Sequence, residues 1–334
     1  MRIGIVTPAP PDSRYGNRIT ALRWARILRR LGNRVSILQT YAGQPYDLLV
    51  ALHARRSHPS ITNFRRQNPA APVIVALTGT DLYRDIRTNH LARESLDIAT
   101  RIVVLQPKAI EALHPYLREK TRVIYQSVEE MRGLVGSSGT VAKTGASKPE
   151  TKRRTGGSFD VCVIGHLRAV KDPFRTAMAA RLLPHSSRVR VLQVGGAMTD
   201  AMTAKAFQEM RVNQRYEWLG ERRRAHVRRV LANSQVFVIS SRMEGGANVL
   251  SEAIIASVPI LASRIAGNIG ILGADYPGYF DVGGTEELAQ LLTLVEASPE
   301  YLADLRARVK KLAFLFTPTR EQKAWANLTR ELFR

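Results

Sequence analysis

The stretch SQVFVISSRMEGGANVLSEAIIASVPILAS, residues 234–263, contains a complete strand–loop–helix–strand unit. Apolar residues fill VFVI (236–239) and VPILA (258–262), and a helical pattern of apolar residues lies between them. Two short apolar runs joined by one helix are typical of parallel strands, because parallel neighbours need a crossover connection. The stretch therefore predicts a parallel sheet with helices packed on it.

The same alternation continues on both sides of this stretch. We expect further strands over the segments 2–6, 34–38, 46–52, 72–77, 101–105, 122–125, 159–165, 189–195 and 216–220. Helices are predicted over 17–32, where Gly32 offers a C-terminal cap, and over 91–99 and 107–118. The predicted fold class is therefore α/β, with doubly wound sheets covered by helices on both faces.

A change in composition divides the chain into two predicted domains. Residues 133–158, GLVGSSGTVAKTGASKPETKRRTGGS, contain no aromatic residue and are predicted to form a flexible basic linker. We expect a Rossmann-like domain over 1–132, a second over 159–316, and a helix over 317–334 that packs back toward the first domain. Ligands of such sheets bind beyond the carboxyl ends of the strands, so the loops there are expected to face a central cleft.

The charge and composition limit the classes of partner. The chain of 334 residues has 50 Lys and Arg against 28 Asp and Glu, a net charge of +22, which favours anionic partners. The basic run ERRRAHVRR (221–229) lacks aromatic residues on which bases could stack, so we interpret it as a solvated helix face and expect no nucleic acid.

No apolar run approaches the roughly 20 residues that span a bilayer, and no segment resembles a signal peptide. With Cys162 as the single cysteine, interpreted as a buried apolar residue, a cytoplasmic location is expected.

Two carboxylates, Glu244 and Glu252, interrupt the small and apolar residues of the opening stretch. Glu244 is expected in the loop after a strand, and Gly245 and Gly246 lead into a helix predicted over 247–257. The first N–H groups of a helix can bind an anion, and glycine lets a phosphate or sugar approach the backbone. Glu252 would need hydrogen-bond donors if it were buried, and a ribose diol would supply two. Alternatively, Glu252 faces solvent or pairs with an arginine.

A second candidate segment, VIGHLRAVKDPF (163–174), follows the first strand of the second domain. Its basic residues could stabilise the negative charge that develops on a leaving diphosphate. This segment and the E-x7-E spacing of the two glutamates resemble the donor site of GT-B glycosyltransferases of the family-4 type. His166 stands where that family has an arginine, and Arg168 is expected to take its place.

The resemblance implies a GT-B fold of two Rossmann-like domains and a nucleotide-sugar donor. It implies that Arg168 and Lys171 bind the diphosphate, that Glu244 contacts the sugar and that Glu252 holds the ribose. The UDP-sugar would be a co-substrate, and no metal ion or other cofactor is expected. The donor-binding residues so implied are Gly16, His166, Arg168, Lys171, Glu244, Gly245, Gly246, Ala247, Asn248 and Glu252.

Three strand-end loops of the first domain carry polar and basic side chains: 7–20, 53–57 and 78–85. Each loop alone is more simply interpreted as solvated charge. Together, basic residues at three strand ends favour an anionic acceptor over a plain alcohol. The candidate acceptor-binding residues are Arg14, Asn17, Arg18, Arg55, Arg56, Thr78 and Thr80. The candidate catalytic residues are His53, Asp81 and Glu244.

Several segments, among them LLVALHARRS (48–57), VALTGTDLYRD (75–85) and DYPGYF (275–280), together resemble the selenosugar synthases of bacterial selenoneine biosynthesis. That resemblance implies transfer of N-acetylglucosamine from a UDP-sugar to selenophosphate, with formation of a carbon–selenium bond. The product would pass to a downstream enzyme of the same pathway. The main alternative is a GT-B O-glycosyltransferase with an alcohol or a cell-envelope lipid as acceptor, and an inactive sugar-nucleotide sensor is another. Residue types alone do not distinguish selenium, sulfur and oxygen acceptors.

Overall fold

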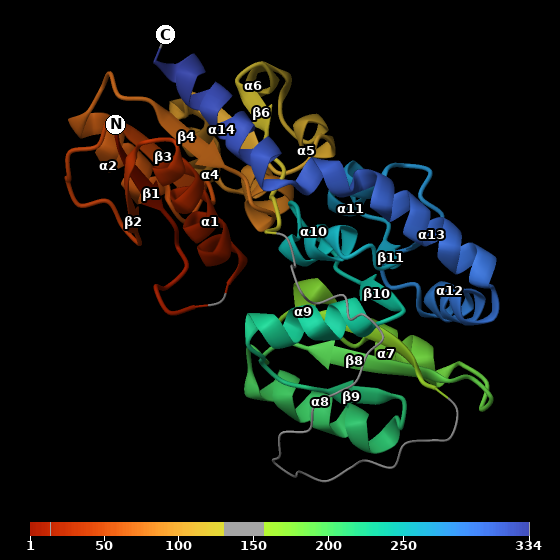
Figure 1. Ribbon diagram of the computed structural model, residues 1–334. Helices are drawn as coiled ribbons and strands as arrows, with labels where there is room; N and C mark the ends of the chain where they lie inside the picture. Colours follow the sequence, from red (N-terminus) through yellow and green to blue (C-terminus); the bar gives the residue numbers. More distant parts are fainter. Residues whose placement is uncertain (14, 130–156, 334) are drawn as a thin grey trace, which may run out of the picture.

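The computed structural model describes residues 1–13, 15–129 and 157–333 (Figure 1). Arg14 and nearly all of the predicted linker lie outside the described residues. The described residues contain two sheets, each of six parallel strands. The α/β class with two Rossmann-like domains is therefore confirmed.

The first sheet has the order β2-β1-β3-β4-β5-β6. Its strands are β1 (Arg2–Val6), β2 (Arg34–Leu38), β3 (Leu48–Leu52), β4 (Val73–Ala76), β5 (Arg101–Val104) and β6 (Thr121–Val123). Every residue of β3 and β4 is buried, as expected for parallel strands covered on both faces. The direction of winding reverses between β1 and β3, and such a switch point is where ligands of open sheets bind.

Helices cover both faces of this sheet. They are α1 (Gly16–Arg30), α2 (His58–Gln67), α3 (Ile86–Thr88), α4 (His90–Ile98), α5 (Lys108–Glu111) and α6 (Pro115–Arg118), with a π-helical turn η1 (Asp81–Asp85). Trp24 and Leu28 of α1 pack in the core on one face, and Phe64 of α2 and Leu96 of α4 pack on the other. The helix predicted over 107–118 is divided in two, because a proline lacks the N–H needed inside a helix and begins α6 instead.

The second sheet has the order β12-β11-β10-β7-β8-β9. Its strands are β7 (Phe159–Ile164), β8 (Val189–Val194), β9 (Tyr216–Trp218), β10 (Val236–Ile239), β11 (Ile260–Ser263) and β12 (Tyr279–Phe280). The switch point lies between β7 and β10, which pair Val161 with Val236. Cys162 is fully buried in β7, and burial raises the pKa of its thiol to about 12. Its side chain is therefore a protonated core residue, as predicted.

The helical elements of the second domain include α-helices and short 3₁₀ turns. They are η2 (Ala169–Lys171), α7 (Arg175–Arg181), α8 (Asp200–Val212), α9 (Arg224–Asn233), α10 (Asn248–Ile255), α11 (Ala266–Leu272), α12 (Thr285–Ala297), α13 (Pro299–Leu312) and η3 (Ala313–Phe316). Helix α10 begins at Asn248, one residue later than the predicted start at 247, and Ala247 separates it from the glycine pair. The predicted strand–loop–helix–strand unit is thus present as β10, α10 and β11.

The last helix, α14 (Pro318–Leu332), leaves the second domain and lies beside elements of the first (Figure 1). The rings of Trp325 and Trp24 meet edge to face, with 4.9 Å between their centroids. Glu331 forms ion pairs with Arg101, at 2.9 Å, and with Arg122. Helix α14 is therefore part of the core of the first domain. Within the described ranges, no helix is long and apolar enough to cross a membrane.

Candidate active site

The switch point of the second sheet brings two charged residues together. Lys171 follows β7 and Glu244 follows β10, and the two are 73 positions apart in the chain. The Lys171 ammonium donates to the Glu244 carboxylate, which also accepts a hydrogen bond of 2.6 Å from the Ser241 hydroxyl. The Lys171 side chain is 20 % exposed and that of Glu244 is 10 % exposed. The structure therefore places both residues where the sequence predicted a donor site.

A small pocket with a mixed polar and apolar lining lies between the ends of β7 and β10. Its lining includes Gly165, Lys171, Gln193 and Ser240. Gln193 is 1 % exposed, and in the described part of the chain its side-chain oxygen finds no hydrogen-bond partner. Gly195 adopts φ of +148°, and a Cβ there would lie 2.0 Å from the Gly165 carbonyl oxygen, so only glycine fits. The pocket thus combines one cation, Lys171, with one unpartnered acceptor, the Gln193 side-chain oxygen.

The first turn of α10 supplies further donors beside this pocket. Ala247 precedes the helix and provides no side-chain cap, so the first N–H groups keep their partial positive charge. Glu252, in the second turn of α10, has a side chain that is 14 % exposed and lies 3.3 Å from the Arg224 guanidinium. The arginine partner that the sequence left as an alternative is thus present.

Gly245 and Gly246, which were predicted to let a phosphate or sugar approach the backbone, lie against the first domain. A Cβ on Gly245 would lie 2.6 Å from the carbonyl group of Thr78, and one on Gly246 would lie 2.6 Å from the Cβ of Leu105. Both neighbours belong to the first domain, which therefore occupies this space. The glycine pair thus allows the two domains to touch, and its contact with a phosphate or sugar stays a prediction.

The start of α1 also reaches the second domain. A Cβ on Gly16 would lie 3.9 Å from the Asn248 side-chain nitrogen. The ring of Tyr15 meets the ring of His166 edge to face, with 5.8 Å between centroids. Arg168 is exposed just before η2. These predicted donor residues therefore lie on both sides of the boundary between the domains.

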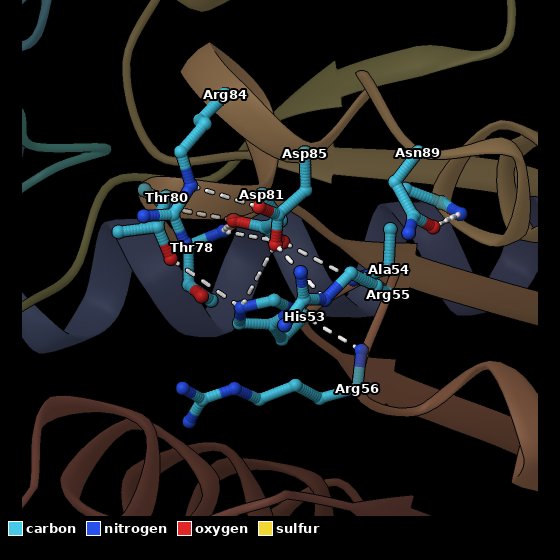
Figure 2. Close-up of polar contacts among 12 residues, drawn as sticks. His53, Ala54, Arg55, Arg56, Thr78, Thr80, Asp81, Arg84, Asp85 and Asn89 are labelled. Atoms are coloured by element: carbon cyan, nitrogen blue, oxygen red, sulfur yellow. Dashed lines mark hydrogen bonds and ion pairs between the residues drawn. The ribbon is translucent and has the colours of Figure 1, made fainter. Parts of the chain in front are cut away.

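At the first domain's switch point, His53 follows β3 and is 4 % exposed (Figure 2). Its φ of +75° lies in the left-handed region, which is uncommon for a residue other than glycine. The backbone N–H of Arg56 donates to Nδ1 at 3.3 Å, so the ring proton is placed on Nε2, 3.3 Å from the Thr80 hydroxyl. Burial lowers the pKa of His53, although the carboxylates of Asp81 and Asp85 oppose that shift. The imidazole is therefore neutral at pH 7, with both nitrogens engaged.

Asp81 is completely buried beneath the same loops. Its carboxylate accepts hydrogen bonds from the backbone N–H groups of Ala54 at 3.1 Å, Thr78 at 3.0 Å and Gly79 at 2.8 Å. These bonds join the loop after β3 to the loop after β4. In this structure Asp81 and His53 therefore hold the loops together, and their catalytic roles stay predictions.

Asp85 is the acidic residue that the sequence interpretation missed. It is 2 % exposed, accepts a hydrogen bond of 3.0 Å from Arg84, and lies 3.6 Å from Arg55 and 3.8 Å from His53. The available signal was its spacing of four from Asp81, which places both acids on one face of a helical turn. Figure 2 shows Asp85 between Arg84 and His53, with the Arg56 side chain extending away from it.

The remaining candidates of the first domain surround these buried acids. Arg55 and Arg56 are exposed, and Thr78 and Thr80 are half-buried. Asn17 and Arg18 are half-buried in the first turn of α1. Among residues 1–13, 15–129 and 157–333, no cluster of His, Cys, Asp and Glu could hold a metal ion.

Comparisons with known proteins agree with this architecture. Residues 147–312 match the family described as "Glycosyl transferases group 1", which is about half of the chain. The structure resembles HepE of Anabaena, solved with UDP and glucose, with a TM-score of 0.74, 15 % identity and coverage of 99 % of this chain and 100 % of that chain. It also resembles a sucrose-phosphate synthase from Thermosynechococcus elongatus, with a TM-score of 0.74, 16 % identity and 99 % coverage of both chains. These likenesses confirm the GT-B fold, and a comparison with curated proteins finds no match.

Proposed function

We propose that this chain, whose second domain belongs to the group 1 glycosyl transferases, transfers a sugar from a UDP-sugar to a small anionic acceptor. The observation that carries the proposal is the contact of Lys171 with Glu244 at the switch point, beside the uncapped start of α10. The UDP bound in the HepE complexes supports a uridine nucleotide as the donor.

In this proposal the second domain stabilises the leaving group. When the bond from the sugar C1 to the diphosphate breaks, its electron pair stays with UDP. Lys171, Arg168 and the first N–H groups of α10 then stabilise the added negative charge, and no metal ion takes part. Glu244 holds the Lys171 ammonium in place and accepts hydrogen bonds from the sugar. The ribose hydroxyls replace Arg224 at Glu252, because the Arg224 side chain is 51 % exposed and is free to turn toward solvent.

For the acceptor we propose selenophosphate, with N-acetylglucosamine as the sugar. Support comes from the resemblance to selenosugar synthases and from the exposed guanidinium groups of Arg55 and Arg56, which suit phosphate oxygens. A selenium lone pair forms the bond to C1, and water then cleaves the phosphorus–selenium bond to release phosphate. Because anionic selenium needs no deprotonation, the buried His53 is not required as a base. The selenosugar would pass to a downstream enzyme of selenoneine biosynthesis.

The deciding experiment is anaerobic incubation of the full chain with UDP-N-acetylglucosamine, with and without selenophosphate. We expect UDP release that depends on selenophosphate, and a product with the mass of a selenosugar. If UDP is released with alcohol or lipid acceptors instead, selenophosphate is not the acceptor, and the O-glycosyltransferase alternative is favoured. No release with any acceptor, in a protein that still binds UDP, would favour the sensor.

A further inference from the structure

A side-chain contact joins the two domains at the start of α10. Arg23 lies on α1, and its Nη1 donates a hydrogen bond of 2.8 Å to the side-chain oxygen of Asn248, the first residue of α10. The side-chain nitrogen of Asn248 faces Gly16, about two turns before Arg23 on α1. The Asn248 side chain can reach α1 because helical side chains point back toward the start of their own helix. The Asn248 amide is therefore held against the first domain.

The position of Arg23 is fixed from the other side by α14. Its Nε lies 3.3 Å from the carboxylate of Glu321, whose side chain is fully buried. The same carboxylate accepts hydrogen bonds of 2.8 Å from the Trp24 indole and 2.8 Å from the Ser127 backbone N–H. Arg23 is thus fixed to the first domain and reaches across to the second.

One end of the Arg23 guanidinium is left without an acceptor. The side chain is 13 % exposed, and among the described residues the buried Nη2 has no hydrogen-bond partner. A buried charged donor without an acceptor is unfavourable. The first N–H groups of α10, next to Asn248, likewise lack a side-chain cap. An anionic oxygen near this point would interact favourably with both.

We propose that Arg23 is a positioning residue for the donor diphosphate: it orients Asn248 and brings a cation of the first domain to the start of α10. The inference rests on the proposed function and extends it, because it gives the first domain a part in binding the nucleotide. It follows that the affinity for the diphosphate depends on the contact between the domains.

The test compares the binding of UDP and of uridine to the full chain by isothermal titration calorimetry. Arg23→Ala is expected to weaken UDP binding about tenfold and to leave uridine binding unchanged, since only UDP carries phosphates. Arg26→Ala, one turn further along α1, removes an exposed pair with Glu129 and serves as the matched control. The Arg23→Ala chain should fold, because Glu321 keeps its bonds from Trp24 and Ser127, and a melting curve checks this. Arg23→Gln, which keeps donors but not the charge, provides a second variant.

A double-mutant cycle with Asn248→Ala tests whether Arg23 acts through Asn248. The double variant should lose little more UDP affinity than the more affected single variant. Equal weakening of UDP and uridine, or unchanged UDP affinity in Arg23→Ala, would overturn the inference and leave the proposed function intact. Additive losses would overturn the claim that Arg23 acts through Asn248. Failure of the unmodified chain to bind UDP would overturn the proposed function, and this inference with it.

Discussion

The two switch points of the molecule arrange their charges in opposite ways. In the second domain, Lys171 and Glu244 face each other beside a pocket between the strand ends. In the first domain, Asp81 and Asp85 are buried, while Arg55 and Arg84 lie exposed around them. The comparison teaches that an acid at a strand end has one of two uses. Glu244 pairs with a cation beside a pocket, whereas Asp81 holds two loops together through their backbone N–H groups.

The sharpest test of the second domain is Lys171→Ala. Loss of a charge that stabilises the leaving diphosphate should lower the rate of UDP release by about 100-fold to 1000-fold. Lys310→Ala, an exposed lysine of α13, is the matched control and should keep full activity. A Lys171→Ala enzyme that retains normal turnover would remove the donor site from this switch point.

In the first domain, Asp81→Ala tests the loop-holding role. Three backbone N–H groups would lose their acceptor, so the free energy of unfolding should fall by about 3 kcal/mol, as measured by urea denaturation. Asp12→Ala, at an exposed position, should leave stability unchanged. If the Asp81→Ala variant has normal stability but no activity, Asp81 acts in the acceptor site. The two switch points would then not differ in how they use their acids.

The ribose assignment is tested by Glu252→Ala. Loss of charge-assisted hydrogen bonds to the two hydroxyls should weaken UDP binding about 30-fold. The unmodified chain should also prefer UDP over 2′-deoxy-UDP, and the variant should not. Glu286→Ala, an exposed glutamate of α12, is the control. If the preference survives in Glu252→Ala, another residue holds the ribose.

Arg55→Ala should affect the acceptor alone. We expect the acceptor KM to rise about tenfold, because one charge-assisted contact is lost. Both kcat and UDP affinity should change little. Arg66→Ala, an exposed arginine of α2 that donates to Asn63, is the control. An equal loss of UDP affinity in Arg55→Ala would show that the acceptor and donor groups are not divided between the domains.

The smallest expected effect is a pH dependence from His53. Its pKa is lowered by burial from the ordinary 6.5, so the unfolded chain binds a proton more readily than the folded chain. Stability should therefore be fully present above pH 6.5 and decrease as the pH falls below it. Urea denaturation at pH 7.5 and 5.5 should show a smaller decrease in His53→Asn, since asparagine tolerates the left-handed backbone. An identical decrease in both proteins would show that His53 does not titrate as described.

Much of the architecture was predictable from local patterns. Apolar runs such as VFVI (236–239) identify buried strands, and Lys171 and Glu244 each follow such a run. Because the carboxyl ends of parallel strands meet at one edge of a sheet, their proximity follows from the alternation of strands and helices. The helix over 107–118 was predicted less well, since Pro115 ends one helix and begins another.

By itself, then, the sequence determined the α/β class, the division into two domains and the residues at the strand ends, because each depends on neighbours along the chain. The tertiary structure alone decided that Asp81 binds backbone N–H groups, that Gly245 meets Thr78, and that Arg23 reaches Asn248. These contacts join residues far apart in the chain, and their geometry depends on how the loops and the two domains pack. No local pattern of residue types records that packing.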